Sequence, residues 1–281
     1  MRIVSLIPSA TEILFAVGAG DDVVGVTFEC DHPAQARERR VVSSTTLPEG
    51  LTPREIDDAV ARAVAAGADL YRLDAGALAD LDADLVVTQD LCAVCAVDVT
   101  AVDDALAHLG CNATVLTVDP HTLDEVLESV VAVGRATGRE GAALTLVRSL
   151  RDRLDAVRTR VRGRPHPRVV VLEWTDPPYA PGHWIPEMVV AAGGEPVLGN
   201  VGEKSVRVTW DAVHAAAPEV VVVAPCGFDR AGAQQQADGL VAAGLLPPGV
   251  LVHAVDANAH WARPGPRLVE GVEELAALLH P

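Results

Sequence analysis

The chain has 281 residues, 49% of them hydrophobic, which is enough apolar material to bury the cores of two domains. Its 39 acidic side chains outnumber 22 lysines and arginines, and the resulting formal net charge of -17 argues against nucleic acid and anionic membrane surfaces as partners. The composition is that of a globular protein and excludes a disordered or fibrous one.

The first residues form a short apolar run, 2–6, that predicts a strand. This run is too short for the hydrophobic region of a signal peptide, and neither a small-residue cleavage site nor a lipobox cysteine follows it. No segment reaches the roughly 20 apolar residues that a membrane-spanning helix needs. We therefore expect a cytoplasmic protein without membrane insertion.

Short β-branched runs alternate with longer segments of helical period, which is the pattern of βαβ units with a parallel sheet. The expected strands cover residues 2–6, 23–26, 85–88 and 114–118, then 168–173, 220–224 and 250–254. Capping boxes at Ser9–Glu12, Thr52–Glu55 and Thr122–Glu125 predict three helix starts. The fold class is therefore α/β.

Residues 139–162 carry apolar side chains at spacings of three and four, with no proline, and predict one long amphipathic helix. A Gly/Pro-containing segment ends it, and the strand–helix alternation then begins again. We therefore expect an N-terminal α/β lobe at 1–138, a connecting helix at 139–163 and a C-terminal α/β lobe at 164–281. A single helical link predicts a stiff hinge between two Rossmann-like lobes.

Ligands of open parallel sheets bind at the carboxyl ends of the strands. The chain has nine aromatic residues, and six of them fall in the loops that follow predicted strands: Phe28, Trp174, Tyr179, Trp184, Phe228 and Trp261. Aromatic side chains withheld from the core in this way favour a pocket for a large, flat, partly apolar ligand. The alternative is that they only close the ends of the domains.

Four of the five cysteines lie in the same loops: Cys30, Cys92, Cys95 and Cys226. Thiolates there could hold zinc or iron, and the Cys92–Cys95 pair could present two sulfurs to one metal. The simpler interpretation is inert, reduced cysteine. The loop histidines His32, His183 and His260 are likewise explained most simply as ordinary loop side chains.

The last of these loops contains Arg263 and Arg267 around a Pro-Gly-Pro turn. Guanidinium groups at this place could hold amide, carboxylate or phosphate oxygens, or the segment could only lead into the last helix. The sequence has no glycine-rich dinucleotide loop, no Walker loop and no nucleophile elbow. Dinucleotide, nucleotide and serine-hydrolase chemistry therefore lose support.

Six segments spread over nearly the whole chain carry a resemblance to a known family: residues 2–18, 23–27, 81–89, 182–194, 217–223 and 263–267. They resemble the vitamin B12, siderophore and haem class of ABC-transporter substrate-binding proteins, with the cobalamin-binding branch most similar. The resemblance implies two lobes joined by one long helix and a ligand between them. It also implies corrinoid-contacting residues at Pro8, Ser9, Phe28, Trp174, Trp184, Phe228 and Trp261.

Transport members of that class dock on a permease through one acidic residue on each lobe. Glu187 matches the second-lobe position, but residues 69–85 contain no glutamate, which weighs against docking on an ABC permease. The cysteines are also foreign to the cobalamin pattern, so a storage, delivery or modifying role is open.

The leading hypothesis is a binding protein for cobalamin or a related corrinoid that catalyses no reaction. Tyr179 would join the aromatic contacts, and Arg263 and Arg267 would supply polar anchoring. The first alternative is a metal-binding protein or metalloenzyme that uses Cys30, Cys92, Cys95 and Cys226. His183 or His260 could join them as ligands, with Glu29 or Asp229 as acid or base. A haem or siderophore binder is a further alternative, disfavoured because no axial-ligand motif stands out.

Overall fold

The computed structural model describes residues 1–68, 70–78, 80–89 and 113–281. Its contacts divide the chain into two compact units. The N-terminal unit comprises residues 1–120 and 127–147, and the C-terminal unit comprises 121–126 and 148–281. The chain therefore passes between the units at three places, and the predicted division at 138/139 and 163/164 stays a prediction.

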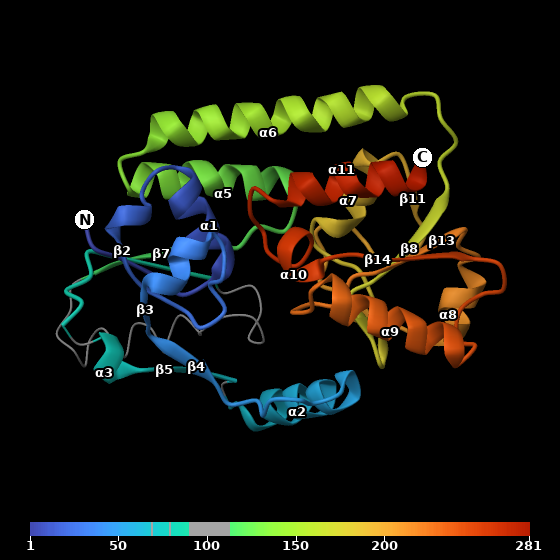
Figure 1. The fold of residues 1–281 in the computed structure, drawn as a ribbon, viewed down its shortest axis with the longest axis horizontal. Coiled ribbons are helices and arrows are strands. Elements are labelled where there is room, and N and C mark those ends of the chain that lie inside the picture. The colour runs from blue at the N-terminus through green and yellow to red at the C-terminus, as the bar shows by residue number, and fades with distance from the viewer. Residues whose placement is uncertain (69, 79, 90–112) are drawn as a thin grey trace. The chain divides into compact units, whose positions relative to one another are not determined.

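Among its described residues, the N-terminal unit contains a five-stranded parallel sheet of order β3-β2-β1-β6-β7 (Figure 1). The strands are β1 (Ile3–Ser5), β2 (Val23–Val26), β3 (Arg40–Val41), β6 (Leu85–Thr88) and β7 (Thr114–Thr117). The central strands β1 and β6 are buried along their whole length, as expected for a sheet covered on both faces. Val4 and Val86 pack there with Leu81 in one apolar cluster.

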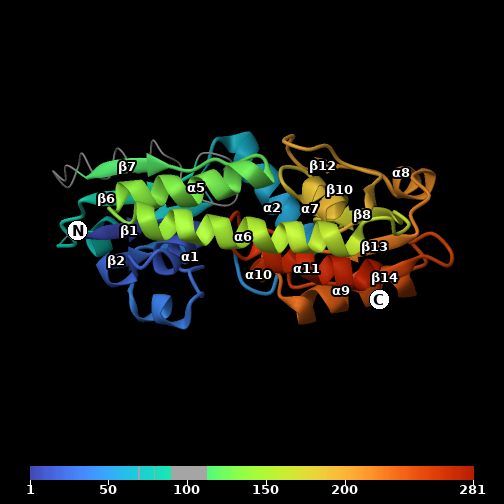
Figure 2. The same ribbon diagram turned by 90° about the horizontal axis from the view of Figure 1, so that it is seen from above.

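Further elements among the described residues of this unit are η1 (Gly20–Asp22), η2 (Ala34–Glu38), α1 (Pro8–Ala16), α2 (Pro53–Ala66), α3 (Ala75–Leu78), and the antiparallel pair β4 (Ser43–Thr45) and β5 (Tyr71–Leu73). Helices α5 (Leu123–Ala136) and α6 (Glu140–Val161), drawn in Figures 1 and 2, meet in this unit where α5 ends and α6 begins. Gly134 permits their close approach, because a Cβ atom there would lie 2.4 Å from the Cβ of Ala143.

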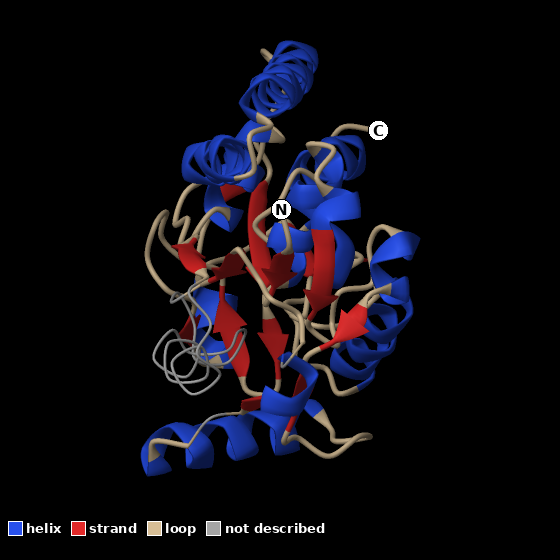
Figure 3. Cartoon of the chain, turned by 90° about the vertical axis from the view of Figure 1, so that its left-hand side faces the viewer, coloured by secondary structure: helices blue, strands red, loops and turns tan. Residues whose placement is uncertain are grey.

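The C-terminal unit has a four-stranded parallel sheet of order β11-β8-β13-β14. Its strands are β8 (Arg168–Leu172), β11 (Glu195–Pro196), β13 (Val220–Val223) and β14 (Leu251–Ala254), beside a small antiparallel sheet of β9 (Trp174–Thr175), β10 (Pro178–Ala180) and β12 (Val206–Arg207). The helices are α7 (Ile185–Ala191), α8 (Trp210–Ala215), α9 (Arg230–Ala242), α10 (Ala257–His260) and α11 (Leu268–Leu279). The four valines of β13 are buried, as expected for one of the two inner strands of this sheet. Strands (red) and their flanking helices (blue) are distinguished in Figure 3.

Two of the three predicted capping boxes are present in the structure. Thr52 and Glu55 form the reciprocal box at the start of α2, and Thr122 and Glu125 do the same before α5. The box predicted at Ser9 is wrong: α1 already begins at Pro8, and Ser9 lies inside the helix with its side chain buried. Proline is well suited to the first helical position because it has no N–H to leave unpaired there.

The predicted α/β class, with two parallel-sheet lobes and a long linking helix, is confirmed. The predicted helix at 139–162 is α6, whose residues belong partly to each unit. Among the helices described, none is both long enough and apolar enough to cross a membrane.

Candidate functional site

In the N-terminal unit, the predicted site residues lie where strands of the parallel sheet end. Pro8 begins α1 three residues after β1, and Phe28 and Cys30 follow β2. Parallel strands bring these ends to one edge of the sheet. Phe28 is 39% exposed, whereas Ser9 and Cys30 are buried, so Phe28 is the side chain of this group that most readily meets a ligand.

The structure adds Tyr71 to this edge. Its ring stacks on Phe28 with the centroids 5.7 Å apart, and its hydroxyl donates a hydrogen bond of 3.3 Å to Glu29 Oε1. Tyr71 reaches this position because β5 pairs antiparallel with β4, with Tyr71 opposite Thr45. Sequence reasoning missed it, since nothing in the local pattern shows that a strand pairs with another 26 positions earlier.

The cysteine prediction is tested only in part. Cys30 is buried, and its sulfur lies 2.9 Å from Thr11 Oγ1, whereas Cys226 is exposed in the other unit. Cys92 and Cys95 lie outside the described residues. Within the part of the chain that is described, no three His, Cys, Asp or Glu side chains are grouped so that they could hold a metal ion. The metal site therefore stays a prediction that rests on the Cys92–Cys95 pair.

In the C-terminal unit, a second group of aromatic side chains lies at the carboxyl edge of the sheet. Trp174 follows β8 and Phe228 follows β13, and their rings are tilted by 59° with the centroids 5.8 Å apart. Both side chains are partly exposed. Tyr179 lies opposite Trp174 in the β9–β10 pairing and has the Arg207 guanidinium 5.8 Å from its ring centroid. These rings form a partly open apolar surface.

Trp184 and Trp261 differ from these residues because they are enclosed. Trp184 is 5% exposed and Trp261 is 0% exposed. The Trp184 indole donates a 2.8 Å hydrogen bond to the Trp261 carbonyl oxygen, which ties the loop before α7 to the end of α10. A ligand would touch the Trp261 ring only after this loop moves. The two tryptophans are therefore part of the packed interior of the C-terminal unit.

His183 and His121 meet beside Trp184. Their ring centroids are 5.7 Å apart, and the His183 backbone has a positive φ of 50°. Burial, together with the neighbouring charges of His121 and Lys204, holds the pKa of His183 below its ordinary value, so His183 is neutral at neutral pH. His121 Nδ1 lies 3.2 Å from the carbonyl oxygen of Gly202, which anchors the segment before α5 to the C-terminal unit.

Glu187, the residue that matches a docking acid in the resemblance, is partly buried in the first turn of α7. Its carboxylate accepts a 2.6 Å hydrogen bond from the backbone N–H of Leu123. Its visible role is therefore to hold the start of α5, and sequence reasoning did not foresee that role because the two residues are 64 positions apart.

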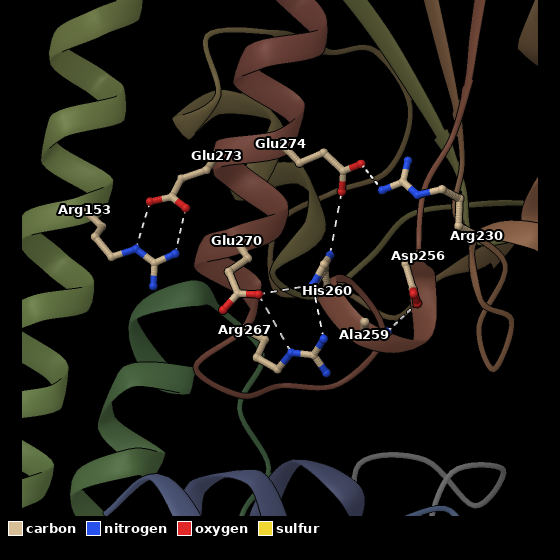
Figure 4. A network of polar contacts seen from close by, with 9 residues as sticks. All are labelled: Arg153, Arg230, Asp256, Ala259, His260, Arg267, Glu270, Glu273 and Glu274. Atoms are coloured by element: carbon tan, nitrogen blue, oxygen red, sulfur yellow. Dashed lines mark hydrogen bonds and ion pairs between the residues drawn. The ribbon is translucent and has the colours of Figure 1, made fainter. Parts of the chain in front are cut away.

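The predicted anchors Arg263 and Arg267 precede α11. Arg263 is only 9% exposed, whereas the Arg267 side chain is 21% exposed. Figure 4 shows Arg267 beside His260 and Glu270, and farther along α11 the Arg153 guanidinium binds Glu273 through two hydrogen bonds of 2.8 and 2.7 Å. Arg153 and Arg267 thus contact carboxylates and a histidine of the protein itself.

The Arg153–Glu273 pair predicts a change in acid stability. The hydrogen bonds from Arg153 hold the pKa of Glu273 below its ordinary 4.5 despite partial burial, so the pair stabilises the fold above pH 4.5 and its contribution is lost as the pH falls through the lowered pKa. We expect Glu273→Gln to unfold at a lower temperature than the parent protein at pH 6 and to differ less from it at pH 3. Thermal unfolding at both pH values measures this, with Glu140→Gln, at an exposed pair with Arg135, as control. A difference that grows toward acid pH would contradict the assignment.

The chain is similar to known proteins over nearly its whole length. A family model described as periplasmic binding protein matches residues 3–243. An uncharacterized ABC transporter substrate-binding lipoprotein of Bacillus subtilis is 28% identical over 100% of this chain and 80% of its own length. A protein of Halobacterium salinarum named cobalamin-binding protein is 27% identical, with 99% of this chain and 69% of that protein covered.

The fold is also similar to that of the apo periplasmic haem-binding protein RhuT from Roseiflexus sp. RS-1. The TM-score is 0.70 and the identity 23%, with 98% of this chain and 96% of that chain covered. The family match covers both units and includes the strand ends that carry Phe28, Trp174 and Phe228. The chain belongs to the periplasmic binding protein family.

Proposed function

We propose that the chain binds a corrinoid of the cobalamin type without chemical change to it. The observation that carries the proposal is the partly exposed aromatic side chains at the carboxyl edges of the two parallel sheets, Phe28 with Tyr71 in one unit and Trp174 with Phe228 in the other. A corrinoid has a flat, largely apolar macrocycle with amide groups on its rim. Such a ligand suits these surfaces, because its faces can stack on the aromatic side chains while the polar groups of its rim stay free for hydrogen bonds.

The choice of a corrinoid over haem is supported by the relatives. A relative that aligns with 99% of this chain is named a cobalamin-binding protein, whereas the haem-binding protein described above is similar in fold at 23% identity. Both ligands are flat macrocycles, so the aromatic edges alone do not separate them. The titration must therefore compare the two directly.

The test is an absorption and tryptophan-fluorescence titration of the full chain with cyanocobalamin, cobinamide and hemin. We expect saturable binding of the corrinoids and weaker binding of hemin. Trp174→Ala and Phe28→Ala should each weaken corrinoid affinity about tenfold, corresponding to about 1.4 kcal/mol, because each removes one stacking surface.

Trp210→Leu serves as the matched control. Trp210 begins α8, which leads into the amino end of β13, and its ring packs on the apolar core of the C-terminal unit. Its replacement should leave corrinoid affinity unchanged. Absence of saturable binding of either corrinoid would reject the proposal, and tighter binding of hemin would replace the corrinoid with haem.

A further inference from the structure

His260 lies at the end of α10 among groups of opposite charge (Figure 4). Its Nε2 atom is 3.2 Å from Glu270 Oε2, and its Nδ1 atom is 3.7 Å from Glu274 Oε2. The Arg267 guanidinium approaches the same Nε2 atom at 3.2 Å. One ring nitrogen of His260 therefore faces both a cation and a carboxylate.

These two contacts of Nε2 demand different protonation states. Arginine only donates hydrogen bonds, so Arg267 needs a lone pair on Nε2, whereas an ionised Glu270 only accepts and needs an N–H there. Neutral His260 protonated on Nδ1 satisfies Arg267 and points its proton toward Glu274. Doubly protonated His260 donates toward both glutamates and repels Arg267.

The other charged groups around His260 have partners of their own. Burial disfavours ionisation of Glu274, but the neighbouring His260 and Arg230 side chains outweigh it and hold the pKa of that carboxyl below 4.5. Glu273 is paired with Arg153 from α6. Asp256 caps α10 by accepting a hydrogen bond from the Ala259 N–H.

Histidine is the side chain that changes charge most readily between pH 5 and 8. The charge of this cluster between pH 5 and 8 therefore depends on His260. The charged groups around it are Arg267, Glu270, Glu274 and Arg230.

The position of His260 is coupled to that of Trp261. Trp261 follows directly in the chain, is fully buried, and its indole Nε1 has no hydrogen-bond partner among the described residues. The backbone at His260 packs closely on α11, because a Cβ atom on Gly271 would lie 2.4 Å from the His260 carbonyl oxygen. The His260 side chain is 21% exposed, and its buried Nδ1 atom has no hydrogen-bond partner among the described residues.

We propose that His260 is a proton-operated switch: its protonation breaks the contact of its Nε2 atom with Arg267, strengthens its contacts with the two glutamates of α11 and changes the environment of Trp261. The proposal goes beyond ligand binding and holds whether or not a corrinoid is the ligand. It requires only the contacts within the C-terminal unit.

The test is NMR of the full chain, ¹⁵N-labelled, without ligand between pH 8 and pH 5. We expect the His260 ring, assigned by its loss in His260→Gln, to carry its proton on Nδ1 at high pH and on both nitrogens at low pH. The Trp261 indole resonance, assigned with Trp261→Phe, should move with the same midpoint. His166→Gln, which replaces an exposed histidine, should leave that movement unchanged.

Two charge-removing variants separate a switch from a structural role. Glu270→Gln should shift the midpoint to lower pH by about one unit, because it removes a carboxylate that favours the imidazolium, and Arg267→Gln should shift it by a similar amount to higher pH. Shifts of the same sign in both variants would overturn the proposal. A Trp261 resonance that does not change between pH 8 and pH 5, or a proton on Nε2 at pH 8, would also overturn it.

Discussion

Replacing Trp184 with alanine is expected to lower the free energy of unfolding by about 4 kcal/mol, because removal of a fully packed tryptophan leaves a large cavity. The side chain is 5% exposed and its indole N–H satisfies the carbonyl oxygen of Trp261. The variant therefore loses apolar burial and also leaves a buried acceptor without its partner. Urea unfolding followed by circular dichroism measures the loss.

Two further variants show which part of Trp184 matters. Trp184→Phe retains most of the apolar ring and removes the N–H donor, so it should lose about 1–2 kcal/mol. Trp174→Ala, at a partly exposed ring, should lose less stability than Trp184→Ala while it weakens ligand binding. Equal losses for Trp174→Ala and Trp184→Ala would show that the enclosed and open aromatic groups had been distinguished wrongly.

Gly199→Ala is expected to destabilise the protein by about 3 kcal/mol through two separate effects. The residue has a φ of +83°, which costs an L side chain about 1–2 kcal/mol, and a Cβ atom would lie 2.0 Å from the Pro181 carbonyl oxygen. This contact packs the 199–203 segment against the loop that carries His183 and Trp184. The melting temperature should fall by roughly 10 °C.

Gly249→Ala is the matched control for Gly199. It has a similar φ of +77°, but no atom lies within 4 Å of the Cβ position, so only the backbone cost of about 1 kcal/mol applies. Gly239→Ala, inside the exposed part of α9 with open space around it, should stabilise the protein slightly. If Gly199→Ala and Gly249→Ala were equally destabilising, the close approach to Pro181 would not hold in solution.

The predictable part of the fold rests on local signals. The valine runs of β8 and β13 and the three- and four-residue spacing along α6 depend on neighbouring residues, and both were correctly located from the sequence. The capping box at Ser9 failed because proline at position 8 offered a better first helical residue. That competition was also local, because the two helix-start signals overlap at residues 8 and 9.

The candidate site was predicted less completely because its members are joined by long-range pairing. Phe28 and Trp174 were expected at strand ends and lie there, but their partners Tyr71 and Phe228 are distant along the chain. The exposure of these aromatic side chains could not be predicted from the sequence either. Trp174 and Trp261 look alike as loop tryptophans, yet one is partly exposed and the other fully enclosed.

The sequence by itself determined the α/β class, the inner strands of both parallel sheets, the long helix α6 and the segments in which aromatic side chains gather, because period and turn chemistry act over a few residues. The tertiary structure decided which of those side chains stay open, which carboxylate faces His260, and why Glu187 holds the Leu123 N–H. Those outcomes depend on the approach of segments that are dozens of residues apart, and the packing of a folded core sets that approach.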